Sequence, residues 1–202
     1  STTFRHEVDA DELERLYGDC DLLIACDGLN SLARRHWEPS FEPDLDVRPN
    51  RYVWLGTHQT FDAFTFSFRE NADGAFWIHA YQFDPETSTF IVETDPASFE
   101  RAGLDPADEA ATIRYCEGLF ADELGGHRLL ANRSQWIRFV TVRNRTWRHG
   151  HAVLIGDAAH TAHFSIGSGT KLAMEDAIEL VDAFRRTGTG DVPAALAAYE
   201  EA

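Results

Sequence analysis

One continuous stretch, residues 152–184, constrains the fold more than any other part of the chain, because it combines a strand, a glycine loop and a helix. Residues 152–155 form a short apolar run with the length of a strand buried in a parallel sheet. Gly156 and Asp157 end this run, and a carboxylate at the C-terminal end of such a strand lies where parallel sheets bind ligands. Residues 172–184 carry apolar side chains at helical spacing, which predicts an amphipathic helix. The stretch therefore indicates an α/β fold with a ligand site at the loop.

The loop before this helix contains Gly167, Ser168 and Gly169, and Thr170 follows it. A glycine loop that leads into a helix presents unpaired backbone N–H groups and the positive end of the helix dipole to whatever lies in front. We therefore expect an anionic or electron-rich ligand there.

A second apolar run, residues 21–26, ends in Asp27 and Gly28. Two expected strands thus carry an aspartate and a glycine at their C-terminal ends, and in a Rossmann-like sheet such ends line the ligand crevice. An Asp-Gly pair alone is a common turn signal, so only the presence of both motifs favours a binding site over a simple turn.

These motifs resemble those of a known family. The sequence G-D-A-A-H at 156–160, with G-S-G at 167–169 and E-D-A at 175–177, resembles the second flavin-binding signature of the FAD-dependent aromatic hydroxylases of the p-hydroxybenzoate-hydroxylase type. The resemblance implies that Asp157 hydrogen-bonds the ribityl chain of FAD and that the following helix points at the N1/C2 carbonyl edge of the isoalloxazine. D-G-x-x-S-x-x-R at 27–34 resembles a further family motif, associated with FAD and NAD(P)H. The implied cofactor-binding residues are Asp27, Gly28, Arg34, Gly156, Asp157, Gly167, Ser168, Gly169 and Thr170.

The residues around the glycines indicate a branch of this family. The usual pattern has proline-rich residues before the first glycine, a glutamine between the glycines and an asparagine after them. Here the sequence H-T-A-H-F-S-I-G-S-G-T-K at 160–171 is similar to the branch that acts on aromatic acyl-CoA thioesters, the salicylyl-CoA 5-hydroxylase and 2-aminobenzoyl-CoA monooxygenase type. The resemblance implies an FAD- and NAD(P)H-dependent monooxygenase that hydroxylates a small aromatic substrate with dioxygen.

The glycine loop G-x-G-x-x-G, which in this family lies near the N-terminus and holds the ADP half of FAD, is not found. The chain begins in an expected strand at 3–8 and ends within an expected helix that starts near 191. We therefore expect an internal fragment that lacks the first βαβ unit and is inactive on its own.

The middle of the chain has a different pattern. Residues 51–94 alternate in period two, are rich in aromatic side chains and contain turn signals at 71–74 and 84–85, which predicts an antiparallel sheet. Helices are expected within 95–126, strand character returns at 135–147, and the proline-rich stretch 39–49 is predicted to be a crossover loop.

The expected domain organisation is accordingly a partial Rossmann-like FAD-binding lobe with an inserted sheet. The lobe comprises residues 1–48 and 143–202, and residues 49–142 form the antiparallel substrate-binding sheet with its helices. An aromatic sheet of this kind suits a wall against a planar ligand.

Four side chains are candidates for a base that activates the aromatic ring of the substrate: His58, His79, Tyr81 and His163. The alternative for each is a packing role, which is commoner for His or Tyr on a strand. His163 is favoured because it lies in the resembled flavin loop, whereas His160 is expected to fix that loop through a backbone hydrogen bond.

One basic cluster, Arg143, Arg145 and Arg148, is either a solvated strand face or a site for a CoA phosphate. The histidine pairs H-x-H at 149–151 and H-x-x-H at 160–163 lack cysteine partners at ligand spacing, so no metal site is expected.

The net charge of −16 argues against binding to nucleic acid or to anionic membranes. Three cysteines without a pairing pattern, no apolar span and no signal peptide indicate the cytoplasm. Another flavin oxidoreductase of the same fold, an isoprenoid reductase or a halogenase, is the alternative, although the halogenase sequence W-x-W-x-x-I is not found. The oligomeric state stays open, with a homodimer as one option.

Overall fold

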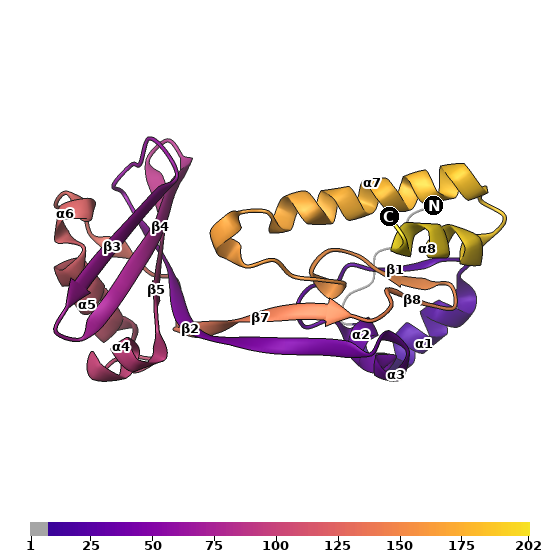
Figure 1. Cartoon of the computed structure of the whole chain (residues 1–202), viewed down its shortest axis with the longest axis horizontal. Coiled ribbons are helices and arrows are strands. Elements are labelled where there is room, and N and C mark those ends of the chain that lie inside the picture. The colour runs from indigo at the N-terminus through magenta and orange to yellow at the C-terminus, as the bar shows by residue number, and fades with distance from the viewer. Residues whose placement is uncertain (1–7) are drawn as a thin grey trace. The chain divides into compact units, whose positions relative to one another are not determined.

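The computed structural model describes residues 8–202 of the chain (Figure 1). It divides into two compact units, which we describe separately. Unit 1 comprises Ser1–Asp46 and Val140–Ala202, and unit 2 comprises Val47–Phe139. The strand predicted at 3–8 falls almost entirely outside the described residues. The sequence-based division placed the inserted sheet at 49–142. That the lobe binds FAD and that the sheet binds the substrate remain predictions.

Unit 1 is built on a small sheet with the strand order β1-β9-β8, formed by β1 (Leu23–Ala25), β9 (Ala152–Leu154) and β8 (Arg148–His149). Strands β1 and β9 are parallel, and Ala25 is paired with Leu154. The ladder continues past the strand ends, where Ile155 N–H donates to the Ala25 carbonyl at 3.0 Å. The two motif-bearing strands predicted from the sequence therefore lie side by side, and their C-terminal loops leave the same edge.

Helices pack on this sheet. The α-helices of unit 1 are α1 (Ala10–Asp19), α2 (Leu32–His36), α3 (Glu38–Phe41), α7 (Gly169–Thr187) and α8 (Val192–Glu200), and two 3-10 turns are η1 (Gly156–Ala158) and η2 (Phe164–Ile166). Several of them begin directly after a residue whose side chain caps the helix: Asp9 before α1, Ser31 before α2 and Asp191 before α8. Helix α7, orange to yellow in Figure 1, ends at Thr187, and its C-cap Gly188 has a φ of 90°, a positive value that favours glycine. The side chains of Leu180, Ala183, Leu196 and Tyr199 pack from α7 and α8 around buried Val153 of β9.

The prediction of a crossover loop at 39–49 is wrong. This stretch contains α3 and the beginning of β2 (Pro43–Thr57), a long strand that pairs with β7 (Ile137–Asn144). Pro39 lies in the first turn of α3 and Pro43 is the first residue of β2, positions at which the fixed φ and the missing N–H of proline cost little. The density of prolines was therefore not a sufficient sign of a loop.

Unit 2 contains the predicted antiparallel sheet, with the strand order β3-β4-β5-β2-β6 and with β7 paired to β2. Its remaining strands are β3 (Thr65–Asn71), β4 (Gly74–Asp84), β5 (Thr87–Thr94) and β6 (Leu129–Leu130). The β3–β4 turn is held by the Asn71 side chain, which accepts hydrogen bonds from the N–H groups of Asp73 and Gly74. The mixed α/β architecture with an antiparallel sheet confirms the predicted fold class.

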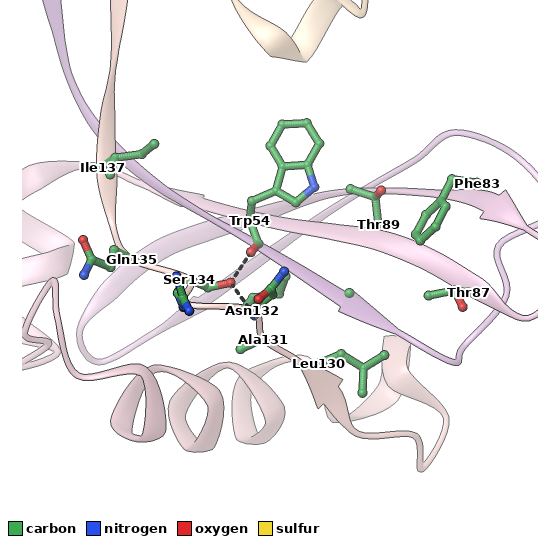
Figure 2. Close-up of a pocket in the computed structure, with 13 residues that line it drawn as sticks. Trp54, Phe83, Thr87, Thr89, Leu130, Ala131, Asn132, Ser134, Gln135 and Ile137 are labelled. Carbon is green, nitrogen blue, oxygen red and sulfur yellow. Dashed lines mark hydrogen bonds between the residues drawn. The ribbon is translucent and has the colours of Figure 1, made fainter. Parts of the chain in front are cut away.

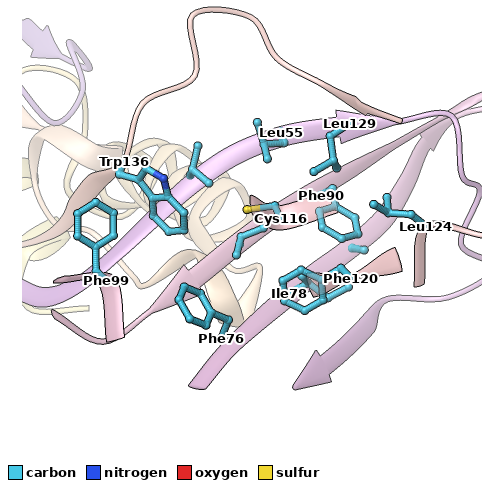
Figure 3. Close-up of a cluster of buried hydrophobic side chains, with 13 residues drawn as sticks. Leu55, Phe76, Ile78, Phe90, Phe99, Cys116, Phe120, Leu124, Leu129 and Trp136 are labelled. Atoms are coloured by element: carbon cyan, nitrogen blue, oxygen red, sulfur yellow. The ribbon is translucent and has the colours of Figure 1, made fainter. Parts of the chain in front are cut away.

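The core of unit 2 lies between this sheet and three helices, α4 (Pro96–Arg101), α5 (Glu109–Leu119) and α6 (Ala121–Leu124). Strand alternation sends Phe76, Ile78 and Phe90 into this core, where each is fully buried (Figure 3). The intervening residues of β4, among them His79 and Tyr81, therefore project to the opposite face of the sheet. Across the described part of the chain, none of the helices has the length and apolar character that crossing a bilayer requires.

Candidate functional site

The site in unit 1 is formed by the loops that follow β1 and β9. Asp27 follows β1, and its carboxylate accepts hydrogen bonds from Leu32 N–H at 2.7 Å and Ala33 N–H at 3.2 Å at the start of α2. Gly28 has a φ of 77°, which explains the glycine at this turn. Part of the hydrogen-bonding capacity of Asp27 is thus used to begin α2.

Arg34 joins the two loops. Its side chain is 3% exposed and donates to the carbonyl of Ala158 at 2.8 Å and to that of Leu29. Burial lowers the pKa of Arg34, and the nearby Asp27 carboxylate opposes this shift. The observed role of Arg34 is therefore to tie the loop after β9 to the loop after β1.

The loop after β9 exposes one carboxylate. Asp157 lies in the 3-10 turn η1 and is exposed, and no hydrogen bond or ion pair of its side chain is found within residues 8–202. Gly156 before it has a φ of 60°, and a Cβ placed there would lie 3.3 Å from the Cβ of Ala173 in α7. Glycine at 156 therefore lets η1 pack closely against α7 and leaves the Asp157 carboxylate available to a ligand.

Asp176 of α7 fastens this loop, a role that we did not assign from the sequence. It is 8% exposed and accepts hydrogen bonds from Gly156 N–H at 2.7 Å and from His160 Nε2 at 3.0 Å. His160 in turn stacks on the Trp147 ring, with 4.9 Å between the ring centroids. The sequence signal was the E-D-A triplet in the resembled motif, whose middle residue turns out to be the anchor. His160 holds the loop as expected, but its side chain bonds to the Asp176 carboxylate and, within the described residues, not to the backbone.

The hydrogen bond that His160 donates to the Asp176 carboxylate raises the pKa of His160 above its ordinary 6.5, against the opposing effect of burial. The charged His160 contact therefore stabilises unit 1 fully below pH 6.5 and is lost as the pH rises through the raised pKa. We expect the thermal stability of unit 1 to fall over that interval in the native chain, and to fall less in His160→Gln. Melting curves recorded between about pH 6 and about pH 9 measure the two slopes. Equal slopes in both proteins would remove His160 as the cause.

The start of α7 is the third part of the site. Its N-cap residue, Ser168, makes no capping hydrogen bond, the first turn contains no acidic residue, and the buried Ser168 Oγ has no partner within the described residues. A Cβ on Gly169 would meet nothing within 4 Å, so the space beside this residue is open. The N–H groups of the first turn, including that of Thr170, and the helix dipole are thus available to an electron-rich group.

His163 precedes this helix and has a local partner. Its Nδ1 lies 2.8 Å from Ser165 Oγ and accepts a hydrogen bond from Ser165 N–H at 3.3 Å, which makes His163 the N-cap of η2. Gly167 ends that turn with a φ of 63°. His163 therefore shapes the loop that leads into α7, and its predicted catalytic role stays a prediction.

The other catalytic candidates lie in unit 2. His79 is 2% exposed, with Nε2 3.2 Å from the buried carboxylate of Glu93, which also accepts hydrogen bonds from Trp77 and Asn50 at 3.0 Å each. This network favours the packing alternative for His79, and Glu93 was missed although it interrupts an apolar strand.

Tyr81 and His58 are more accessible than His79. Tyr81 is half-buried and stacks on Phe64, with centroids 5.2 Å apart. His58 is exposed, and its Nδ1 lies 3.2 Å from the Glu86 carbonyl.

The arginine cluster of β7 and β8 is neutralised within unit 1. Arg143 lies 3.8 Å from an Asp44 carboxylate oxygen, and Arg145 and Arg148 pair with Glu42 and Glu200 at 2.8 and 2.9 Å. This pairing favours the alternative of a solvated strand face over a phosphate site. Within the described residues, no group of three or more His, Cys, Asp or Glu side chains is arranged to hold a metal ion.

Comparisons with known proteins identify the family of the chain. A family model described as an FAD binding domain matches residues 4–202. A salicyloyl-CoA 5-hydroxylase from a Streptomyces species is 45% identical over 207 residues, covering 98% of this chain and 39% of the relative. A 3-hydroxy-4-methyl-anthranilyl-(aryl-carrier protein) 5-monooxygenase from Streptosporangium sibiricum is 44% identical over 185 residues, covering 92% of this chain and 48% of the relative. The chain thus spans less than half the length of these two curated relatives.

The fold also matches solved structures. The tetrameric form of 2-methyl-3-hydroxypyridine-5-carboxylic acid oxygenase has a TM-score of 0.63 at 18% identity, over 90% of this chain and 49% of that chain. At this identity the likeness concerns the fold alone.

Proposed function

Because the chain belongs to the FAD binding domain family, we propose that it is part of an FAD- and NAD(P)H-dependent monooxygenase that hydroxylates an aromatic thioester with dioxygen. The observation that carries the proposal is the exposed Asp157 carboxylate in the turn packed on α7, whose first turn has open N–H groups. A ribityl chain needs a hydrogen-bond acceptor, and the isoalloxazine edge needs donors and positive potential. Both kinds of group are present in unit 1.

Within this proposal each part of unit 1 has a task. Asp157 would accept a hydrogen bond from a ribityl hydroxyl, and the N–H groups at Gly169 and Thr170 would stabilise negative charge on the flavin. Asp27, Gly28 and Arg34 shape the adjoining loop, and Gly156, Gly167 and Ser168 keep the backbone open to the cofactor. Bound FAD supplies the redox and oxygen chemistry, and the protein orients it.

The substrate class is inferred from the relatives and from unit 2. The two curated relatives carry in their names an aromatic acyl group on coenzyme A or on an aryl-carrier protein. The face of the sheet opposite the core is rich in aromatic side chains, including the stacked pair Phe64 and Tyr81, and suits a planar ring. We keep Tyr81, His58 and His163 as candidates for the group that activates this ring, and we infer a packing role for His79. The free state of Cys20, Cys26 and Cys116 supports our inference of a cytoplasmic protein.

Replacing Asp157 with alanine tests the cofactor site. We expect the affinity for FAD to fall about tenfold or more, because one hydrogen bond to a charged acceptor is lost. Asp182→Ala, on the same unit but in a surface ion pair with Arg185, is the matched control. Both variants are made in the longest natural polypeptide that carries this sequence. Isothermal titration with FAD measures the affinities, and amide shifts at Asp157 and 167–170 report where the cofactor binds. If FAD bound equally to both variants, or shifted none of these amides, the assignment would be wrong.

The reaction is tested on the longest natural polypeptide that carries this sequence. We expect NADH or NADPH oxidation to be stimulated by an aromatic acyl-CoA, with one oxygen atom incorporated into the ring, as measured by mass spectrometry with labelled dioxygen. Oxidation without ring hydroxylation would favour the reductase alternative, and halide-dependent product would favour the halogenase.

A further inference from the structure

A cavity lies wholly within unit 2, where β2 and β5 meet the segment between β6 and β7 (Figure 2). It has a volume of about 610 Å³. Its walls combine apolar side chains such as Trp54, Leu130 and Ile137 with the hydroxyls of Thr87 and Thr89. Amide side chains are added by Asn132 and Gln135. Among the described residues that line it, one is charged, Arg133, and none is a carboxylate.

The backbone at Arg133 is held in an unusual conformation. Its φ of 56° lies in the left-handed region, which non-glycine residues adopt rarely and which is found enriched at ligand-binding positions. The neighbouring Ser134 keeps it there: Ser134 Oγ donates to the Trp54 carbonyl at 2.6 Å, and Ser134 N–H donates to Glu109 at 2.7 Å. Two residues further on, Trp136 N–H donates to the Pro106 carbonyl at 3.1 Å. The loop is therefore anchored on both the sheet and the helical side.

The charge of Arg133 is not neutralised by the protein. No ion pair of its guanidinium is found within residues 8–202, whereas Arg143, Arg145 and Arg148 each have a carboxylate partner. The chain has a net charge of −16, whereas the one charged residue that lines this cavity in the described part of the chain is positive. A guanidinium in such a setting favours a phosphate or another anion.

We propose that this cavity binds the phosphopantetheine arm of the thioester substrate, with Arg133 contacting its phosphate. The proposal rests on the thioester class proposed above. The arm consists of a phosphate, two amides, a hydroxyl and a geminal dimethyl group. The guanidinium matches the phosphate, the side chains of Asn132, Gln135, Thr87 and Thr89 match the amides and the hydroxyl, and the apolar wall with Trp54 matches the dimethyl group.

The test is a calorimetric titration of the chain, without FAD, with 4′-phosphopantetheine and with pantetheine, which lacks the phosphate. We expect Arg133→Gly to weaken binding of 4′-phosphopantetheine about tenfold and to leave pantetheine binding unchanged. Glycine removes the guanidinium and also tolerates the left-handed backbone, so the loop keeps its shape. Arg133→Lys is expected to retain part of the affinity. The matched control is Arg138→Gln, which removes an exposed arginine of β7 that does not line the cavity.

Two further titrations, with coenzyme A and with a holo-carrier protein, identify the source of the phosphopantetheine. Coenzyme A binding more tightly than 4′-phosphopantetheine indicates a soluble thioester, and a holo-carrier protein binding more tightly indicates a protein-bound one, with the same dependence on Arg133 in either case. The proposal is overturned if neither ligand binds, or if Arg133→Gly and Arg138→Gln bind both ligands like the native chain. If FAD does not bind at Asp157 but the Arg133-dependent titration succeeds, the monooxygenase proposal fails and the cavity assignment stands. If FAD binds at Asp157 but the titrations show no dependence on Arg133, the cavity assignment fails and the monooxygenase proposal stands.

Discussion

Asp176→Ala is expected to lower the free energy of unfolding of unit 1 by about 2–4 kcal/mol. The carboxylate is 8% exposed and accepts hydrogen bonds from Gly156 N–H and His160 Nε2. Alanine would leave that N–H group buried without an acceptor and would remove the group that holds the imidazole, and water has little access to replace either. Because Gly156 directly precedes Asp157, the same substitution is expected to weaken FAD binding as well.

Hydrogen exchange is the suitable measurement, since it reports the amides of unit 1 separately from those of unit 2. The matched control is Asp182→Ala on the same helix, where a surface pair with Arg185 is worth about 0–1 kcal/mol. If Asp176→Ala cost no more than this control, the buried contacts would not be what fastens η1 to α7.

Phe90→Ala is expected to destabilise unit 2 by about 3–5 kcal/mol. The ring is fully buried between the sheet and the helices, 5.8 Å from the Phe120 ring and 6.2 Å from the Phe61 ring, measured between centroids (Figure 3). Removal of the ring loses its transfer free energy and leaves a cavity that the surrounding β-sheet cannot close, because its backbone is held by ladder hydrogen bonds on both sides of β5.

Calorimetry and hydrogen exchange of unit 2 measure this loss. The comparison variant is Phe68→Ala on the edge strand β3, whose side chain is 71% exposed and should cost well under about 1 kcal/mol. Similar losses for the two variants would show that Phe90 does not belong to a tightly packed core.

Local sequence patterns determined much of the fold and the family. The apolar runs at 21–26 and 152–155 predicted two strands of a parallel sheet, and the period-two stretch 51–94 predicted the antiparallel sheet. Both kinds of strand are confirmed, and the structure adds that β1 and β9 pair with each other. These predictions succeeded because the strand pattern follows from short-range periodicity. The predicted apolar face of α7 was less informative, because Met174, Ile178 and Val181 of that face are exposed. The glycine and aspartate motifs likewise carried the resemblance that the match over residues 4–202 supports.

Only the tertiary structure decided which polar groups meet. Asp176 and Gly156 are twenty residues apart in the sequence, and their hydrogen bond closes the loop between them. His79 and Glu93 meet because β4 and β5 are paired in one register. Nothing in residues 143–148 indicated that each of the three arginines would have an acidic partner elsewhere in unit 1, nor that Arg133 would line a cavity without one. Periodicity indicated which face of the strands is buried, but the partner of a charged side chain depends on how distant segments pack, and no local pattern contains that information.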